Sequence, residues 1–580
     1  MRIPGCSKHE SGVNSDYHMK TLTKTSSRFK IAAWLVMVLA WLGQAIAARN
    51  PLDADAVSYL DISYSYLSGH WHSLINGYWS PVYPFLLALW VKIFKVGPLR
   101  ESLAIHLLAA ASLIAALISF EYFLSVLFVC RNKLAEENGE DLNALVSDDV
   151  IRFAGYLLFF WISTFLTPPY LEQPDILVFA LYLVSAALSM QLVFTAKEWW
   201  RFALLGVVLG LGYLTKAVMF PLAFTFITTL LLRREWRRAI PGALLTFAFF
   251  AAVSAPFIFE LSKSKGRLTY GDVGALAYRG IMGFDTDEEA RRPQIPSSAS
   301  AKPLAAPHVH EFTTTLFLGT YPPWADPSYG YHGAPFRFDL RRQLNRIHVV
   351  LRSYFDLYIE QLGALATGFL VLLIWGGSYW EFGRRLLPQT PLWLPAIAGL
   401  ALYALVRTEG RMLAGFTIGL FAAASTALRL PAGDSTRRIS RSMAIAVSIV
   451  LLSQIAIQIG HKGFGFSSSD NSSDWEVAKS LQQMGVQPGD RVSYLGDTLV
   501  NHAWAHLGRV RISAEIPEED ESSFWAAEQP ERAAAIRWLA ASGAKVLVTR
   551  NVPATAMSMG WIKIAGTQYY TLPLTGENAY

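Results

Sequence analysis

Stretches of about 20 apolar residues, each bounded by charge or by Pro/Gly clusters, recur along this chain and limit its fold more than any other feature. A helix of that length crosses the hydrocarbon core of a bilayer. The 580 residues are 53% hydrophobic and 16% charged, which is more apolar than an average soluble protein. The pattern predicts about eleven membrane spans. They cover residues 31–48, 101–129, 151–167, 175–195, 201–217, 219–232, 239–259, 350–376, 391–407, 412–429 and 442–459.

Basic residues gather in short clusters between the predicted spans, and they predict the topology. Four of them, Lys20, Lys24, Arg28 and Lys30, precede the first span and place the N-terminus in the cytoplasm. Alternation then brings the later Arg/Lys clusters to the same side, as the positive-inside rule requires. The formal net charge of +6 is explained by these clusters, so no nucleic-acid partner is expected.

Three regions follow from this organisation. Residues 1–30 form a cytoplasmic N-terminal tail, and residues 31–460 form a transmembrane domain with large outer loops at 49–100 and 260–349. A composition shift near residue 460 begins an outer, periplasmic domain over residues 461–580. The expected fold class is mainly α: a polytopic helix bundle with a soluble C-terminal α/β domain.

Within the C-terminal domain, short helices and strands alternate. We expect helices over 474–484 and 531–542, strands over 491–495 and 545–549, and a last strand pair within 561–573. The only two cysteines, Cys6 and Cys130, support neither a disulfide framework nor a cysteine-based zinc site.

Acidic residues gather at the outer ends of several predicted spans. Asp53 and Asp55 follow the first span, Glu172 and Asp175 precede the fourth, and Glu409 lies two residues before Arg411. A carboxylate in a partly desolvated pocket can accept a proton or hold a divalent cation, and an arginine can bind phosphate. The pattern therefore indicates a phosphate-displacing transfer site on the outer face.

Each of these residues also has a structural explanation. Asp53 and Asp55 could cap a helix, Asp175 could complement a helix dipole, and Glu409 with Arg411 could be an ion pair in a tight turn. Lys216 could be a snorkelling lysine at a span end.

The first outer loop resembles that of bacterial GT-C glycosyltransferases, a superfamily that includes protein mannosyltransferases, aminoarabinose transferases and Rgt-type lipopolysaccharide enzymes. The resemblance rests on short motifs and extends in pattern over about residues 30–460. The motifs are Asp53-Ala54-Asp55, Tyr59-Leu60-Asp61, Asn76-Gly77-Tyr78-Trp79-Ser80-Pro81-Val82-Tyr83-Pro84, Pro174-Asp175, Tyr213-Leu214-Thr215-Lys216 and Glu409-Gly410-Arg411.

This resemblance implies a catalytic aspartate in the first outer loop. Counting back from Tyr59, Asp55 takes the position of the base, whereas Ala56 replaces the glutamate that often follows it in the family, so Asp53 is a second candidate. Residues 81–96 would form an interfacial helix, as their length and two lysines also indicate. Residues implied to bind substrate are Asp175, Glu172, Lys216, Glu409, Arg411, Tyr59 and Tyr83.

The expected function is that of a bacterial inner-membrane glycosyltransferase. It would move a sugar from a polyprenyl-phosphate donor to an acceptor outside the cytoplasm, which could be a lipid, a glycan or a protein. No metal ligands are assigned and no cofactor is certain, although a divalent cation is a candidate. The cluster His308, His310 and Glu311 is too small to predict a metal site by itself. Two alternatives are a multi-span transporter and a non-enzymatic envelope assembly protein.

Overall fold

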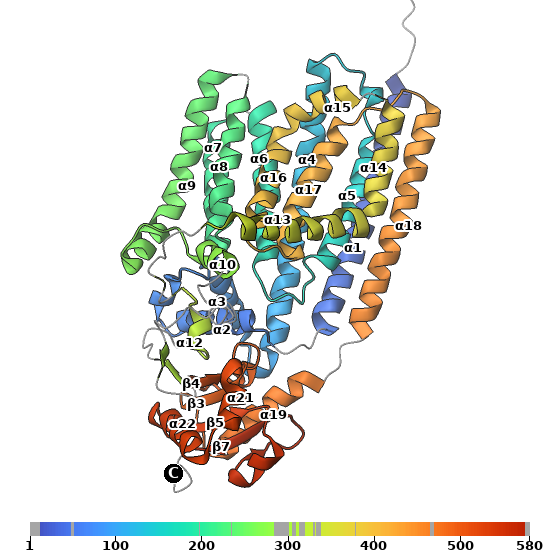
Figure 1. The fold of residues 1–580 in the computed structure, drawn as a ribbon. Helices are drawn as coiled ribbons and strands as arrows, with labels where there is room; N and C mark the ends of the chain where they lie inside the picture. Colours follow the sequence, from blue (N-terminus) through green and yellow to red (C-terminus); the bar gives the residue numbers. More distant parts are fainter. Residues whose placement is uncertain are drawn as a thin grey trace, which may run out of the picture.

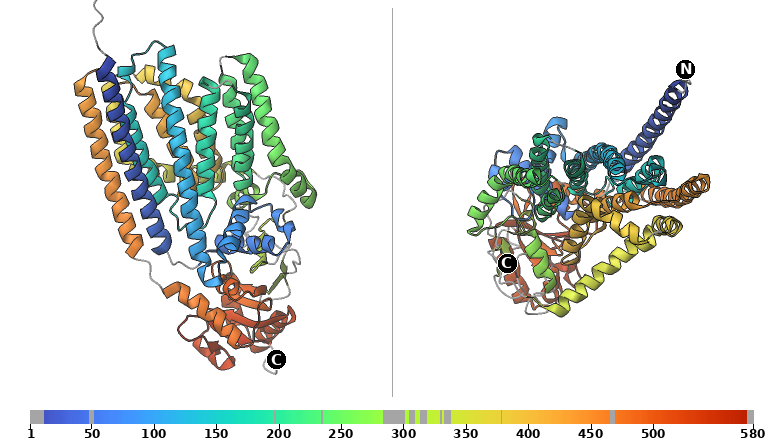
Figure 2. Two further views of the ribbon diagram at one scale, coloured as in Figure 1. Left: turned by 180° about the vertical axis from the view of Figure 1, so that it is seen from behind. Right: turned by 90° about the horizontal axis from the view of Figure 1, so that it is seen from above.

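The computed structural model describes residues 12–47, 52–195, 198–233, 235–282, 301–303, 309–312, 319–328, 331, 338–377, 379–464 and 469–574. A bundle of roughly parallel helices forms most of the molecule, and a small mixed sheet lies beyond one end of it (Figure 1). Short helices occupy the layer between the bundle and the sheet, as the view from behind also shows (Figure 2).

Ten of the eleven predicted spans each fall mainly on one bundle helix within the described residues, and the span over residues 350–376 does not. Within the part of the chain that the structure describes, five helical stretches are long and apolar enough to cross a membrane, namely Lys30–Ala47, Pro98–Glu137, Asp175–Phe194, Trp236–Lys265 and Asp434–Gly460. A bent pair of helices would make a sixth, so the expected number of about eleven is not confirmed. The bundle helices are α1 (Gly12–Ala47), α4 (Glu101–Glu137), α5 (Asp148–Phe165), α6 (Asp175–Phe194), α7 (Trp199–Thr215), α8 (Met219–Thr229), α9 (Trp236–Lys265), α14 (Gly363–Gly376), α16 (Thr390–Ala404), α17 (Ala414–Ala427) and α18 (Asp434–Phe464), with the short α15 (Tyr379–Leu386) at one end.

The predicted span over residues 350–376 is wrong as a single straight helix. Helix α13 (Leu340–Phe355) and the π-helical turn Asp356–Gln361 meet α14 at 75°. Figure 1 shows α13 crossing the bundle at the level where α7 and α8 end. The physical reason lies in α13 itself, because its charged side chains cannot enter hydrocarbon without a large free-energy cost.

The layer beside the bundle contains helices from two distant parts of the chain. The first outer loop supplies α2 (Ala54–Leu67) and α3 (Val82–Phe94), and the second supplies α10 (Val273–Met282) and α12 (Pro322–Ala325). Helix α3 matches the predicted interfacial helix, and it ends at Lys95, which adopts a left-handed conformation with φ of 47°. Both outer loops therefore contribute to one layer.

The sheet has the strand order β1-β2-β4-β3-β5-β7-β6. The expected helices and strands are present as α19 (Ser469–Gln483), α22 (Gln529–Ala541), β3 (Arg491–Gly496), β5 (Ala544–Thr549), β6 (Ile562–Lys563) and β7 (Tyr570–Pro573). Three further elements were not expected from the sequence: α20 (Ala503–Leu507), β4 (Arg511–Pro517) and α21 (Glu518–Ala526). Nor was it expected that β1 (Ala301–Pro303) and β2 (His310–Phe312), both from the second outer loop, extend the sheet at the β4 edge.

The sheet shares a hydrophobic core with the layer of short helices. Leu60 of α2, Trp324 of α12, Val492 of β3 and Trp504 of α20 are buried in the same cluster. A separate cluster fills the helix bundle. Because one core extends across α2 and β3, the sheet holds the first outer loop in place.

Candidate active site

The first turn of α2 presents two carboxylates to the layer between bundle and sheet. Asp53 is the N-cap of this helix, and its Oδ1 accepts a hydrogen bond of 2.7 Å from the backbone N–H of Ala56. Its own backbone N–H donates to Glu172 Oε2 at 3.1 Å. Asp53 therefore has the capping role that acidic residues commonly take at helix starts.

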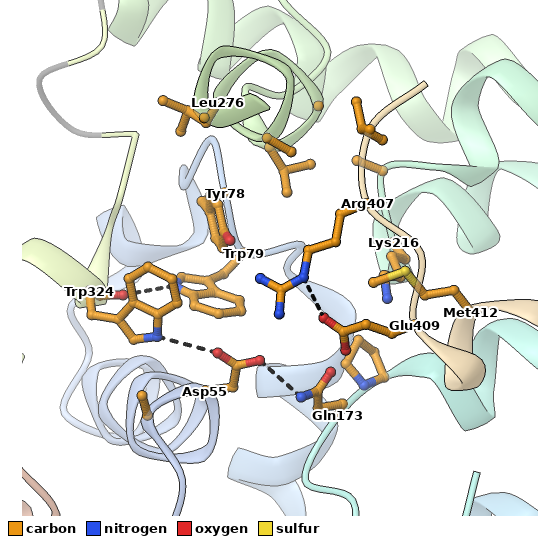
Figure 3. Close-up of a pocket in the computed structure, with 18 of the residues that line it drawn as sticks. Asp55, Tyr78, Trp79, Gln173, Lys216, Leu276, Trp324, Arg407, Glu409 and Met412 are labelled. Atoms are coloured by element: carbon orange, nitrogen blue, oxygen red, sulfur yellow. Dashed lines mark hydrogen bonds and ion pairs between the residues drawn. The ribbon is translucent and has the colours of Figure 1, made fainter. Parts of the chain in front are cut away.

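Asp55 is bonded by side chains rather than by the backbone. Its Oδ2 accepts a hydrogen bond from Gln173 Nε2 at 2.9 Å, and its Oδ1 accepts a longer one from the Trp324 indole N–H at 3.3 Å (Figure 3). Two donors from distant segments thus orient a carboxylate that is free of capping.

Burial and mutual repulsion change the acidity of both aspartates. Desolvation raises the pKa of Asp55 to about 6, and the negative charge of Asp53 adds to the effect, while Arg411 opposes it. Desolvation and the charge of Glu172 raise the pKa of Asp53 to about 7. A carboxylate with a raised pKa is a stronger base, so Asp55 is suited to accept a proton near neutral pH.

A cluster of cations lies across the cavity from α2. Lys216 Nζ is 2.6 Å from Asp175 Oδ1, and Arg411 Nη2 is 2.6 Å from Glu409 Oε2. Arg407 Nε lies 3.0 Å from Glu409 Oε1 (Figure 3). Three cations therefore face two carboxylates, and the cluster keeps one positive charge.

Arg411 has spare hydrogen-bonding capacity. Its Nε is buried and donates no hydrogen bond to any residue that the structure describes, and the nearest carboxylate oxygen, Asp175 Oδ2, is 3.8 Å away. A buried donor without a partner carries a free-energy cost that a bound anion would remove.

Aromatic rings line the wall between the two charged groups. Tyr59 packs edge-on against Trp79 with ring centroids 4.9 Å apart and against Tyr83 at 4.8 Å. Trp79 also donates its indole N–H to the carbonyl of Trp324 at 3.0 Å. This contact joins α12 to the first outer loop and fixes the indole that bonds Asp55.

Asp55, Lys216, Arg407 and Arg411 line one cavity of about 1340 Å³. One part of its wall is apolar and comes from α10 and α16, including Leu276, Leu402 and Leu405. Another part comes from the C-terminal domain and includes Asn501, Arg550 and Tyr569. The cavity thus connects the bundle helices with the sheet domain.

The structure gathers most of the predicted site residues but not all of them. Asp53, Asp55, Tyr59, Lys216, Glu409 and Arg411 line the large cavity. Asp175 lies behind it, where it contacts Lys216 and shares a cavity of about 20 Å³ with Arg411. Glu172 and Tyr83 do not line the large cavity. Glu172 instead holds the start of α2 and lies 3.3 Å from His106 Nε2.

Sequence reasoning missed three residues of the site. Gln173 and Arg407 lie beside predicted residues, and Trp324 belongs to an aromatic-rich stretch that also suits a membrane-interface belt. Only the fold shows that Trp324 contacts Asp55, because 269 residues separate them in the sequence.

A further set of buried charges fixes α2 two turns beyond Asp55. His506 Nδ1 lies 2.9 Å from Asp61 Oδ1, and its Nε2 lies 3.0 Å from Glu101 Oε2. Asp61 Oδ2 also accepts a hydrogen bond of 2.6 Å from the backbone N–H of Thr320, close to Trp324 in the chain. The C-terminal domain thus contacts both segments that build the Asp55 environment.

The described residues contain no group of three or more His, Cys, Asp and Glu side chains that could hold a metal ion. Of the cluster His308, His310 and Glu311, the last two lie in β2, whereas His308 lies outside the described residues. The divalent cation stays a prediction.

No protein-family model matches the sequence, and no curated protein matches it. The fold, however, is similar to that of solved structures. ArnT from Cupriavidus metallidurans bound to undecaprenyl phosphate has a TM-score of 0.54 and 12% identity, covering 96% of this chain and 99% of that chain. The structure of the same ArnT in the apo state has a TM-score of 0.52 and 12% identity, and the match again covers 96% of this chain and 99% of that chain. A third similar structure is the archaeal oligosaccharyltransferase AglB from Archaeoglobus fulgidus, in complex with an inhibitory peptide and a dolichol-phosphate. Its TM-score is 0.51 at 11% identity, and the match covers 90% of this chain and 69% of that chain. The overall fold of this chain is therefore similar to that of ArnT and AglB over most of its length.

Proposed function

We propose that this protein is a multi-pass membrane glycosyltransferase that transfers a sugar from a polyprenyl-phosphate donor to an acceptor on the outer face of a bacterial inner membrane. One observation carries the proposal: a buried carboxylate with a raised pKa, Asp55, and a cation cluster with one unbalanced charge line the same cavity. Displacement of a phosphate from a sugar requires a base that takes the proton of the acceptor and a site that binds the anionic phosphate.

The charge of the cluster fits the donor. A polyprenyl-phosphate sugar is a phosphodiester with one negative charge, and Lys216, Arg407 and Arg411 exceed their partners Asp175 and Glu409 by one positive charge. The apolar wall from α10 and α16 suits a prenyl chain. Two proteins of similar fold have been solved with undecaprenyl phosphate and with a dolichol-phosphate.

The proposed step is a single displacement with inversion at the sugar. Asp55 takes the proton of the acceptor hydroxyl or amine as that group bonds to the anomeric carbon. The bond from this carbon to the phosphate oxygen breaks, and its electron pair leaves with the polyprenyl phosphate. Arg411 and Lys216 stabilise the charge that develops on this phosphate. The side chains of Tyr78, Trp79 and Trp324 line the same space and offer aromatic faces to a sugar.

The acceptor is expected to enter from the side of the C-terminal domain. Asn501, Arg550 and Tyr569 form the polar part of the cavity wall there, and the Arg550 guanidinium lies 5.2 Å from the centre of the Tyr569 ring. The cavity thus has a polar part from the C-terminal domain and an apolar part from α10 and α16. A hydrophilic acceptor and a lipid donor could thus occupy the cavity together.

A transporter is less compatible with these features. Transporters commonly hold their substrate near the membrane midplane between broken helices. Here the charged groups belong to α2, to the start of α6 and to the segments that flank α16 and α7, at the end of the bundle that adjoins the sheet.

Conversion of the donor in proteoliposomes tests the proposal. Purified protein, incubated with a pool of polyprenyl-phosphate sugars and envelope extract, should release free polyprenyl phosphate, which mass spectrometry detects. Arg411→Gln should weaken donor binding about 10- to 100-fold, because it removes charged hydrogen bonds. Arg437→Gln, on an exposed position at the start of α18, is the matched control. Passage of a solute across the vesicles with the donor left intact would contradict the proposal.

A further inference from the structure

Helix α13 has an unusual composition for its position. Its sixteen residues include Arg341, Arg342, Arg346 and Arg352 and no acidic residue. The helix contacts α10 and crosses the bundle at the level where α7 and α8 end, toward the sheet (Figure 1). Arginines are normally sparse in short segments on the outer side of a membrane protein. Four of them on one outer helix therefore call for a binding partner of opposite charge.

The side chains of α13 are sorted into three stripes. At 100° per residue, one stripe packs on the protein and contains the buried Gln343 and Val350. The second is apolar and exposed, with side chains between 54% and 59% accessible. It consists of Leu340, Leu344, Leu351 and Phe355.

The third stripe is cationic and lies next to the exposed apolar one. It consists of Arg341, His348 and Arg352, which repeat at intervals of seven and four residues, and all three are exposed. The guanidinium groups of Arg341 and Arg352 make no hydrogen bond or ion pair with the residues that the structure describes. The other two arginines are engaged, since Arg342 lies 3.7 Å from Asp339 and Arg346 donates to the carbonyl of Val406.

The orientation of α13 agrees with a position in the membrane interface. Helix α14, which follows it, is apolar and exposes Leu370, Ile374 and Trp375. With α14 across the bilayer, the 75° bend turns α13 close to the membrane plane. Apolar and cationic stripes side by side on an in-plane helix match the two zones of a leaflet, acyl chains and headgroups.

We propose that the cationic stripe of α13 is a binding site for anionic phospholipid headgroups of the outer leaflet, with the exposed apolar stripe among the acyl chains. Charge complementarity supports a lipid with a net negative headgroup, and the neighbouring apolar stripe supports a lipid rather than a soluble acidic protein. The site is independent of the proposed function.

The position of α13 gives this site a consequence for the cavity. Gln343 and the preceding Phe338 line the cavity wall, and Gln343 Nε2 donates to the carbonyl of Leu405 at 3.2 Å. Bound lipid would hold α13 against α16 and so would maintain this wall. Occupancy of the stripe by anionic lipid is therefore expected to affect what the cavity binds.

Native mass spectrometry of the full-length protein tests the site directly. The protein is released from nanodiscs that contain equal amounts of phosphatidylglycerol and phosphatidylcholine, and the retained lipids are counted. Wild type should retain phosphatidylglycerol preferentially. The double variant Arg341→Gln/Arg352→Gln should lower that preference about 30-fold, since each cation near an anionic surface contributes about fivefold. Arg341→Lys/Arg352→Lys should keep it.

Two controls make the result decisive. Arg437→Gln/Arg438→Gln removes two exposed charges at the other end of the bundle and should leave the preference unchanged. Unfolding temperatures measured on all variants identify any that fail to fold, and the lysine pair tests the same positions in that case. An unchanged lipid preference in the folded glutamine variant would overturn the proposal. So would a loss of dimers in that variant, because the face would then be covered by a second copy.

Discussion

Asp55 differs from its neighbour Asp53 in what surrounds it, although the two lie on the same turn. The Oδ1 of Asp53 accepts a hydrogen bond from the backbone of α2, whereas Asp55 accepts hydrogen bonds only from side chains. The same desolvation acts on both. Only Asp55 can therefore release its contacts to an acceptor without loosening the helix start.

Replacing the proposed base is expected to remove most of the activity without unfolding the protein. Asp55→Asn keeps the size of the side chain and can still bond Gln173, but it cannot accept a proton. We expect the rate of sugar transfer in proteoliposomes to fall by about 10²- to 10⁴-fold, the usual contribution of a general base. Asp149→Asn, an exposed acid at the start of α5, is the matched control. A loss of less than about threefold in Asp55→Asn would exclude it as the base.

The raised pKa of Asp55 predicts the pH dependence of transfer. Only the ionised carboxylate can accept a proton, so kcat/KM should rise with pH and level off above about pH 6. Asp53→Asn keeps a capping oxygen but removes the negative charge that helps to raise the pKa of Asp55. The acid limb of the profile should therefore shift to lower pH in this variant. Loss of transfer in Asp53→Asn at all pH values would show that the two carboxylates are assigned the wrong way round.

Short motifs predicted the charged residues of the site, and the fold supplied their partners. Asp55, Lys216 and Arg411 were predicted because each lies at a helix end within a recognisable motif. Gln173 and Trp324 could not be predicted in this way. Both contact Asp55 from distant segments of the chain, and the sequence does not show which distant segments lie close together. Glu172 and Tyr83 were expected to bind substrate, but they lie behind the cavity wall.

At the scale of single elements, α2 is the element whose position matters most for the site. Its start is bonded to Glu172, its middle to His506 through Asp61, and Ser58 Oγ donates to the carbonyl of Trp324 at 2.9 Å. These contacts come from three different parts of the chain. A mostly buried helix of fourteen residues is thereby held in place from three sides.

Removing the imidazole of His506 is expected to loosen α2. Glu101 would stay buried with Arg509 as its remaining cation, and Asp61 would lose the cation with which it is paired. Uncompensated buried charge typically costs about 3 kcal/mol or more. His506→Gln should therefore lower the unfolding temperature in detergent markedly, whereas His70→Gln on the surface should not. Equal unfolding temperatures for the two variants would contradict this role.

The same histidine predicts how stability varies with pH. Its hydrogen bonds and ion pairs with Asp61 and Glu101 raise the pKa of His506 to about 9 against the cost of burial. The resulting stabilisation is complete below the ordinary value of about 6.5 and is lost as pH rises through about 9. Wild type should therefore become less stable between pH 7 and pH 9.5. The His506→Gln variant should lose most of this dependence, and a wild-type stability that stays flat over this range would argue against a charged His506.

Element boundaries were predictable where the apolar pattern was continuous. The windows for α4, α6 and α9 coincide with helices, because nothing within them interrupts burial or lipid contact. The break at Leu362 was not predicted, although Arg352, Asp356 and Glu360 interrupt the apolar pattern just before it. The strands β1 and β2 were also missed, because three residues each are too few to show an alternating pattern.

For the molecule as a whole, the sequence predicted a C-terminal domain separate from the transmembrane domain, and the structure shows how these two of the three predicted regions are joined. The composition shift near residue 460 does mark the end of the bundle helices. It does not separate two hydrophobic cores, because Trp504 and Val492 of the C-terminal domain share a core with α2. Hydrophobic pattern reports the environment of each segment and not which segments pack together.

The predicted membrane topology assigns each connecting segment of the chain to one side of the membrane. Positive-inside alternation places residues 574–580 outside and the Arg233–Arg238 cluster inside. A periplasm-active phosphatase fused after residue 580 should therefore be active, and the same reporter fused after residue 237 should be inactive. An inactive C-terminal fusion at normal protein level would refute an odd number of spans.

The most direct measurement of the central claim is the pool of polyprenyl-phosphate sugars in cells whose only copy of the protein is Asp55→Asn. Lipid extracts of this strain and of a deletion strain should accumulate the same polyprenyl-phosphate sugar, identified by mass spectrometry, while the surface glycans lose that sugar. A wild-type lipid pool and unchanged glycans, with the variant present at wild-type amounts in the membrane, would contradict the account.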